Sequence, residues 1–179
     1  KERERWERLL SDLGVGRRHM FKTFENYDAQ TKEKQSALEA CKTFCKAVED
    51  RAAIGGLVLL GKPGTGKTHL SCAVINSLAR KQIYGERINL RDMLAEIKAT
   101  YNKGSESTEV DLIAHCGRRR LLILDEVGAF SMSEHEKAIF TSIIDRRYEN
   151  EGYTVLVSNL DFEALKTEIG DRNIDRLRE

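Results

Sequence analysis

The chain has 179 residues, of which 40% are hydrophobic and 33% charged, and its formal net charge is +1. This length suits one domain with a substantial core. The near-neutral charge excludes a chain that attracts nucleic acid over its whole surface, so any nucleic-acid contact must come from a local patch. No apolar run reaches the roughly 18 residues of a membrane span, and the N-terminal residues lack the apolar core of a signal peptide.

The four cysteines, Cys41, Cys45, Cys72 and Cys116, form no CxxC pair, so a structural zinc site is not expected. We interpret these cysteines as small apolar residues buried in the core. Free thiols predict the reducing environment of the cytoplasm.

The first 30 residues are charged and poorly periodic. Trp6, Leu9 and Leu13 have the spacing of a short amphipathic turn, which Gly14 then breaks. We interpret residues 1–30 as a linker or the trailing edge of a preceding domain.

Helical and strand patterns alternate through residues 31–179, which we interpret as one domain. The sequence predicts helices at 31–50, 67–81, 92–101 (capped by Asp92), 108–116 and 133–150 (begun by a capping box of Ser133 and Glu136), a short helix capped by Asp161 and another from Asp171. It predicts strands at 54–60, 86–90, 121–124 and 154–157. This alternation is typical of an α/β fold, a parallel sheet with helices on both faces in three layers.

The segment Gly61–Thr68, GKPGTGKT, matches GxxxxGK[ST] and lies between a predicted buried strand and a predicted helix. Glycines let successive backbone N–H groups point at an anion, and the helix N-terminus adds positive potential. Lys67 is expected to contact the β- and γ-phosphates, and Thr68 to offer its hydroxyl to Mg²⁺. The sequence therefore predicts binding of ATP (or ADP) with Mg²⁺ by Gly61, Pro63, Gly64, Thr65, Gly66, Lys67, Thr68 and the adjoining His69.

Two carboxylates end the apolar run 121–124. Asp125 is expected to hold the Mg²⁺ shell at the carboxyl edge of the sheet, and Glu126 to act as general base on the attacking water. Asn159 follows the next strand, where its amide can hydrogen-bond that water or the γ-phosphate. Asp125, Glu126 and Asn159 could each be an ordinary residue at the end of a strand. Their positions at successive strand ends, after the Lys67 motif in the sequence, favour a catalytic interpretation.

These motifs, in this order, resemble those of AAA+ P-loop ATPases, in which Asn159 would be sensor 1. Several stretches are similar to the bacterial helicase loaders DnaC and DnaI and to the related transposition helper IstB. They are FENY (24–27), GKPGTGKTHL (61–70), LLILDEVG (121–128), IDRR (144–147), VSN (157–159) and GDRNIDRL (170–177). The resemblance covers about residues 20–179, and it implies an AAA+ ATPase domain with the sheet order 1-4-3-2.

The resemblance also implies roles for single residues. Arg176 would be an arginine finger that acts on the ATP of a neighbouring subunit, which implies self-association. Arg172 and Arg178 are alternatives for that role. Phe24 and Tyr27 would lie near the adenine, or equally would anchor the entering segment in the core.

Loaders of this kind hold single-stranded DNA. Tyr101 lies between Lys98 and Lys103 at a predicted helix end, so its ring can stack on a base while the lysines neutralise phosphates. Ser133 and His135 match positions that contact the strand in the family. An isolated exposed tyrosine is otherwise ordinary surface.

The family has a helicase-binding domain ahead of this region, and a fifth strand and a sensor 2 region after it. We therefore expect a fragment that is incomplete at its C-terminus, with the first strand at an edge of the sheet. The first functional hypothesis is an ATP-controlled loader that delivers a replicative DnaB-type ring helicase to single-stranded DNA. The second is an IstB-like ATPase that assists a transposase on duplex DNA. The third, a small-molecule kinase, lacks a recognisable acceptor-binding insert.

Overall fold

The strands form one parallel sheet. A computed structural model describes residues 1–53, 55–102 and 104–179. Within these ranges the sheet has the order β1-β4-β3-β2. Its strands are β1 (Leu57–Leu60), β2 (Gly85–Asn89), β3 (Leu121–Val127) and β4 (Tyr153–Ser158). The predicted α/β class and strand order are confirmed, with β1 at one edge. Ile54, which the sequence analysis placed at the start of the first strand, lies outside the described residues.

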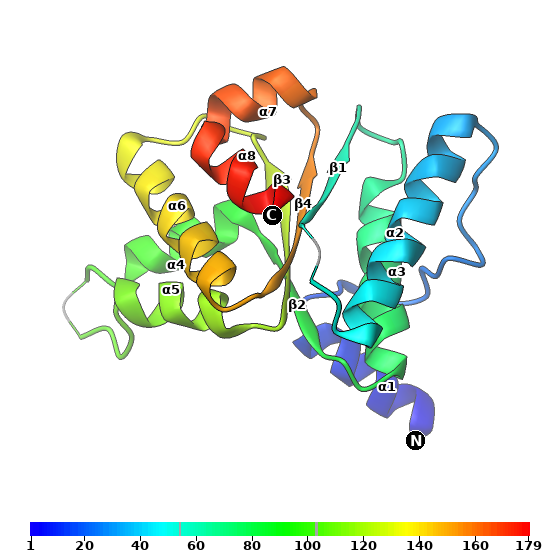
Figure 1. Ribbon diagram of the computed structural model, residues 1–179. Coiled ribbons are helices and arrows are strands. Elements are labelled where there is room, and N and C mark those ends of the chain that lie inside the picture. Colours follow the sequence, from blue (N-terminus) through cyan, green and yellow to red (C-terminus); the bar gives the residue numbers. More distant parts are fainter. Residues whose placement is uncertain (54, 103) are drawn as a thin grey trace.

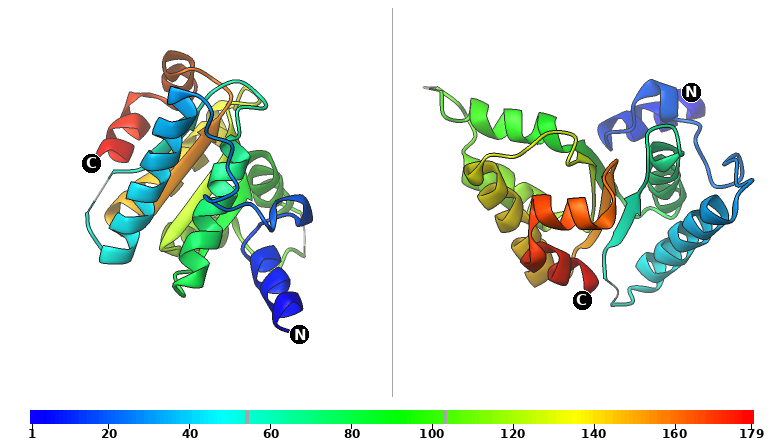
Figure 2. Two further views of the ribbon diagram at one scale, coloured as in Figure 1. Left: turned by 90° about the vertical axis from the view of Figure 1, so that its right-hand side faces the viewer. Right: turned by 90° about the horizontal axis from the view of Figure 1, so that it is seen from above.

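Helices cover both faces of the sheet (Figures 1 and 2). One face carries α1 (Glu2–Asp12), α2 (Lys32–Asp50) and α3 (Lys67–Arg80). A 3-10 turn at Arg17–His19 lies in the segment between α1 and α2. The other carries α4 (Leu90–Ala99), α5 (Glu109–Arg118), α6 (Glu134–Glu149), α7 (Phe162–Ile169) and α8 (Asp171–Arg178). Within the described ranges, no helix combines the length and the apolar character that crossing a bilayer requires.

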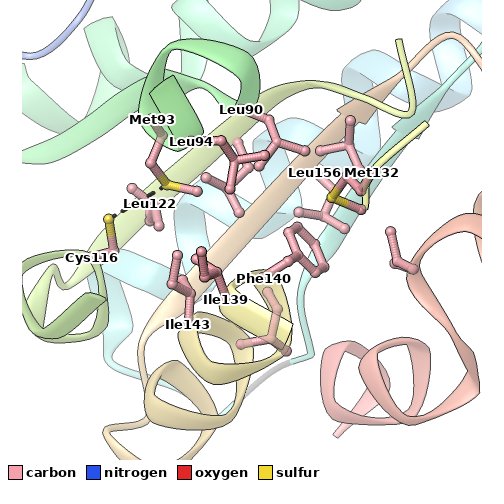
Figure 3. Close-up of a cluster of buried hydrophobic side chains, with 14 of the residues drawn as sticks. Leu90, Met93, Leu94, Cys116, Leu122, Met132, Ile139, Phe140, Ile143 and Leu156 are labelled. Atoms are coloured by element: carbon pink, nitrogen blue, oxygen red, sulfur yellow. Dashed lines mark hydrogen bonds between the residues drawn. The ribbon is translucent and has the colours of Figure 1, made fainter. Parts of the chain in front are cut away.

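The central strand β3 supplies both core layers. Leu121 and Ile123 pack in the cluster under α2 and α3, whereas Leu122 and Leu124 pack in the cluster under α4 to α8, because successive side chains of a strand point to opposite faces. Figure 3 shows the second of these layers, with Leu122 among the side chains of α4, α5 and α6. A strand that is buried on both faces reads as a continuous apolar run, which is why the sequence revealed it.

The N-terminal segment packs against the same fold. Leu10, Val15 and Met20 are buried in the cluster under α2 and α3. The side-chain amide of Asn76 on α3 donates to the carbonyls of Met20 (3.2 Å) and Lys22 (2.9 Å). The predicted boundary at residue 30 therefore falls between two segments that share one core cluster.

Helix starts follow the predicted caps with one exception. Ser133 and Glu136 form a capping box at α6, and the Asp161 carboxylate caps α7. The predicted cap Asp92 is wrong, because α4 begins at Leu90 and its cap is Asn89, whose side chain accepts from the Arg91 N–H at 2.9 Å. Strand β2 passes directly into α4, so Asp92 lies inside the first turn, where its charge still favours the helix dipole.

All four cysteines are free and buried, as predicted. Burial raises the pKa of the Cys41 and Cys45 thiols to about 12. These thiols are therefore protonated at neutral pH and act as small apolar side chains.

Arg147 on α6 is a buried structural arginine. Its side chain is 1% exposed and donates to the Cys116 carbonyl (2.7 Å), the Arg119 carbonyl (2.8 Å) and the Thr154 hydroxyl (2.8 Å). Burial lowers the pKa of this guanidinium to about 10, so it stays charged at neutral pH. The second arginine of IDRR thus joins the end of α5 to the start of β4.

The variant Arg147→Met is expected to lower the free energy of unfolding by about 3 kcal/mol, because methionine fills the space but leaves buried acceptors without a donor. Urea unfolding followed by circular dichroism measures this change. The exposed neighbour Arg146 supplies the matched control, since Arg146→Met is expected to change stability by less than about 0.5 kcal/mol. Equal effects of the two variants would contradict the structural role of Arg147.

Candidate nucleotide-binding site

The loop between β1 and α3 has the backbone geometry of a phosphate cradle. Gly66 is the N-cap residue of α3 and has φ +95°, in the left-handed region. A Cβ at Gly66 would lie 2.7 Å from Cε2 of Tyr27, so no other residue fits there. The first N–H groups of a helix have no partner within that helix, so an anion at the start of α3 can accept from them.

A cavity of about 460 Å³ opens at this helix end. It brings together the phosphate loop, the carboxyl end of β3 and the end of β4. Its lining residues are His19, Lys22, Pro63, Gly64, Gly66, Lys67, Thr68, His69, Asp125, Glu126, Val157, Ser158 and Asn159. Lys67, Asp125, Glu126 and Asn159, which lie far apart in the sequence, thus share one cavity, while His19 and Lys22 are lining residues that the sequence analysis missed.

A second, larger cavity of about 780 Å³ lies at the opposite ends of the strands. It is lined by residues such as Arg51, Arg120 and Tyr153, near the start of β4. None of its described lining residues belongs to the phosphate motif. The smaller cavity is therefore the candidate nucleotide site.

Lys67 is held over its own loop. Its Nζ donates to the carbonyls of Gly61 (2.6 Å) and Lys62 (3.0 Å). Burial lowers the pKa of this ammonium, and the nearby Asp125 carboxylate partly offsets the shift. Thr65, another motif residue, tightens the loop by donating from its hydroxyl to the Lys62 carbonyl at 2.9 Å. The Lys67 ammonium is thus placed within the cavity and near the Asp125 carboxylate.

The two carboxylates of β3, Asp125 and Glu126, lie in a β-bulge. The register between β3 and β4 shifts just after Leu124, so that Asp125 and Glu126 together face a single position of β4. Glu126 adopts φ +59°, which is uncommon for a residue other than glycine. Asp125 is consequently buried (2% exposed), whereas Glu126 is exposed at the mouth of the cavity.

Two residues of β2 hold these carboxylates, and the sequence analysis missed both. The Arg87 guanidinium forms a short ion pair with Asp125. The Asn89 side-chain amide donates to Glu126 at 2.6 Å. Arg87 and Asn89 are two positions apart, on one face of the strand. The spacing of these two polar residues on either side of Ile88 is the signal that could have indicated them, but its meaning depends on β2 lying beside β3.

The residues present fit a magnesium ion bound with a nucleotide. The Thr68 hydroxyl and the Asp125 carboxylate line the same cavity, and Mg²⁺ prefers such oxygen ligands together with phosphate oxygens and water. Asp125 already faces a cation, the Arg87 guanidinium. Among the described residues, no group of three or more His, Cys, Asp or Glu side chains is arranged to hold a metal ion.

Phe24 and Tyr27, which are predicted to lie near the adenine, make several contacts within the protein. Phe24 and Tyr27 pack against the core cluster under α2 and α3. The Tyr27 hydroxyl donates to the Thr65 carbonyl at 3.2 Å, and its ring meets that of His69 edge-on at 5.1 Å. The His69 ring in turn bonds the Thr23 carbonyl at 2.8 Å. These contacts favour the anchoring alternative, and an adenine contact of Phe24 or Tyr27 stays a prediction.

The three candidate finger arginines lie on α8. The Arg176 guanidinium stacks on the Tyr148 ring at 4.0 Å and lies 3.7 Å from Asp145. Arg172 pairs with the same Asp145 at 2.6 Å, and Arg178 lies over a different ring, that of Phe162. None of these contacts tests which arginine serves a neighbouring subunit, so the assignment stays a prediction.

The predicted DNA contacts cluster on one surface. The Tyr101 hydroxyl lies 2.8 Å from Nε2 of His135 and also donates to Glu109. The Ser133 hydroxyl serves as the α6 cap, where it is 2.8 Å from Glu136. Tyr101 and His135, which the sequence indicated as separate DNA contacts, thus lie side by side, and their contact with DNA stays a prediction.

Of the two lysines predicted to flank Tyr101, only Lys98 is among the described residues. Lys98 pairs with Glu136 at 2.8 Å, and this bond, with those from Ser133, lowers the pKa of Glu136 to about 2. Lys103 lies outside the described residues.

The strand order, the phosphate loop and the polar carboxyl edge of the sheet define a P-loop fold of the AAA+ type. The crystal structure of the DnaC helicase loader superposes with a TM-score of 0.78 at 21% identity, covering 92% of this chain and 97% of that chain. The crystal structure of DnaI gives a TM-score of 0.78 at 22% identity, covering 90% and 89%.

The family model described as IstB-like ATP binding protein matches residues 3–177, so the chain belongs to this family. It is similar to the replicative helicase loader DnaC of Buchnera aphidicola subsp. Schizaphis graminum, with 33% identity over 175 residues, 96% of this chain and 69% of that protein. The protein of the same name from Escherichia coli K12 is 29% identical over 172 residues, again 96% and 69%. The resemblance inferred from the motifs is confirmed.

Proposed function

We propose that the chain is the ATPase domain of a helicase loader, which uses ATP and Mg²⁺ to deliver a replicative DnaB-type ring helicase to single-stranded DNA in the cytoplasm. The observation that carries the proposal is the single cavity shared by Lys67, Thr68, Asp125, Glu126 and Asn159. The similarity to proteins named replicative helicase loader supports the choice of partner.

Five residues of the cavity have tasks in the proposed reaction. The first N–H groups of α3 and the Lys67 ammonium bind the phosphates. Thr68 and Asp125 would hold Mg²⁺, which neutralises phosphate charge. Glu126 accepts a proton from the attacking water, and Asn159 orients that water or the γ-phosphate.

Transition-state charge on the γ-phosphoryl oxygens requires a further cation, and Arg176 of an adjacent copy is proposed to supply it. The half-buried Arg176 side chain, stacked on Tyr148, leaves its guanidinium partly open to solvent. ATP binding would then be coupled to the association of the subunits, because the γ-phosphate would contact both copies.

The proposed function is tested by loading itself. The protein is combined with the DnaB-type helicase of the same organism and a single-stranded DNA circle, and the helicase bound to the circle is measured after gel filtration. We expect helicase transfer that requires ATP and this protein. Transfer that is unchanged without the protein would contradict the loader function.

The matching family model, named for IstB-like proteins, favours a second candidate, an ATPase that assists a transposase on duplex DNA. The ATP site would be the same in both cases. Binding to single-stranded and duplex oligonucleotides of equal length, in the presence of ATP, separates them. A preference for duplex DNA would exclude the loader and support the second candidate.

The variant Tyr101→Ala is expected to weaken single-stranded DNA binding by roughly 5- to 150-fold, because stacking on one base contributes about 1–3 kcal/mol. Fluorescence anisotropy with labelled oligo-dT measures the affinity. Tyr84→Ala is the matched control, because the two tyrosines are similarly exposed, Tyr84 to 50% and Tyr101 to 54%. Tyr84 directly precedes β2, at the opposite end of that strand from α4. Tyr101→Phe keeps the ring and should keep the affinity. Equal losses for Tyr84→Ala and Tyr101→Ala would refute this DNA contact.

A further inference from the structure

Arg87 joins the candidate metal-binding carboxylate to a segment more than seventy residues earlier in the chain. Its NH2 group pairs with Oδ2 of Asp125, and its NH1 group donates to the Gly14 carbonyl at 3.3 Å. The backbone N–H of Arg87 donates to the Leu13 carbonyl at 3.0 Å. One residue of β2 thus contacts both the cavity and the turn after α1.

The contact between this turn and β2 is close. A Cβ at Gly14 would fall 1.9 Å from the Arg87 carbonyl oxygen, and Gly14 has φ +80°. Only glycine allows the two backbones to approach in this way. The turn also closes on α1, because the Gly14 and Val15 N–H groups donate to the carbonyls of Ser11 (3.0 Å) and Leu10 (2.9 Å). Residues 10–15 therefore sit on β2 as a fixed unit.

Asp125 is the carboxylate that compensates the charge of Arg87. The Arg87 side chain is 17% exposed and that of Asp125 is 4% exposed. The other oxygen of Asp125 already accepts from the Glu126 N–H at 2.7 Å. In the described part of the chain, the buried side-chain atoms without a hydrogen-bond partner include Nε of Arg87 and Nδ1 of His19. Removing one member of such a pair leaves an uncompensated buried charge.

A divalent cation and Arg87 compete for Asp125. Drawing the carboxylate toward the metal takes away the counter-charge of the guanidinium, and the metal's own charge repels it. We propose that Arg87 is a positioning residue for Asp125 and that it transmits metal binding at this carboxylate to residues 10–15, which loosen when Mg²⁺ binds. This inference rests on the proposed ATP-Mg²⁺ site.

Hydrogen exchange tests the link without measuring activity. Three amides report on it directly, those of Gly14, Val15 and position 87, because their bonds fix residues 10–15 to β2 and α1. The protein is compared with ADP and EDTA and with ADP and Mg²⁺, so that the nucleotide is present in both samples. We expect exchange of these amides to rise about fivefold with Mg²⁺, the equivalent of one net hydrogen bond.

Variants at position 87 separate the link from a general effect of the metal. Arg87→Met should exchange faster at Gly14 and Val15 in both samples and show no further change with Mg²⁺. Arg87→Lys, which keeps the charge, secures the test if the methionine variant fails to fold, and should retain part of the Mg²⁺ response. Arg91→Met, at an exposed arginine that stacks on Phe130, should behave as the unaltered protein.

The outcomes distinguish the link from the site. If ADP protects amides 64–68 but Mg²⁺ leaves Gly14, Val15 and position 87 unchanged, the link is wrong and the nucleotide site stands. A Mg²⁺ response that survives in Arg87→Met also overturns the link. If ADP protects no amide of the phosphate loop, the proposed ATP site fails, and the link fails with it.

Discussion

The variant Lys67→Ala is expected to lose ATP binding by at least about 100-fold. The Lys67 ammonium lies in the cavity with Asp125 and the N-terminus of α3, and its two bonds to loop carbonyls place it over the phosphate cradle. A hydrogen bond to a charged group contributes about 1.5–3 kcal/mol, and Lys67 is expected to make more than one such bond to the phosphates. Isothermal titration calorimetry with ATP and Mg²⁺ measures the affinity.

The control for Lys67 is a lysine at the other end of the same helix. Lys81 follows α3, is largely exposed and faces Glu49 at 3.9 Å. Lys81→Ala should bind ATP as the unaltered protein does, which excludes a general loss of positive charge as the cause. Tight ATP binding by Lys67→Ala, in a sample whose circular dichroism is unchanged, would contradict the site.

The variant Arg176→Ala is expected to bind ATP normally but to lose hydrolysis in the assembled protein by about 10³- to 10⁵-fold, the range for arginine fingers. Arg176 lines the larger cavity rather than the proposed nucleotide cavity of its own chain, so we expect it to act on the nucleotide of another copy. Phosphate release in the presence of single-stranded DNA measures the effect. Binding is measured separately, so that loss of turnover is not mistaken for loss of substrate.

Mixed assemblies show whether Arg176 acts between subunits. Glu126→Gln subunits cannot activate water but retain their arginine, so adding them to Arg176→Ala subunits should restore part of the hydrolysis. No restoration in the mixture would refute the finger assignment. Arg172→Ala and Arg178→Ala test the two alternatives, and the exposed Arg118 on α5 provides a neutral control.

Patterns that depend on neighbours in the sequence were predicted well. The phosphate loop, the capping box at Ser133 and the buried strand before Asp125 each depend on short spacings, and the structure has all three. Asp92 was predicted as a cap because it precedes an amphipathic pattern. The actual cap, Asn89, depends on where β2 ends, and that is set by its pairing with β3.

The chain sequence by itself determined the class of fold and the residues that can bind phosphate, because glycine spacing, apolar periodicity and strand-end carboxylates are local properties of a polypeptide. Only the tertiary structure decided what surrounds these residues. It set Arg87 against Asp125 and Asn89 against Glu126, and it packed residues 10–15 on β2. The physical reason is that a buried charge needs a compensating partner, and which partner is near depends on the order of strands in the sheet.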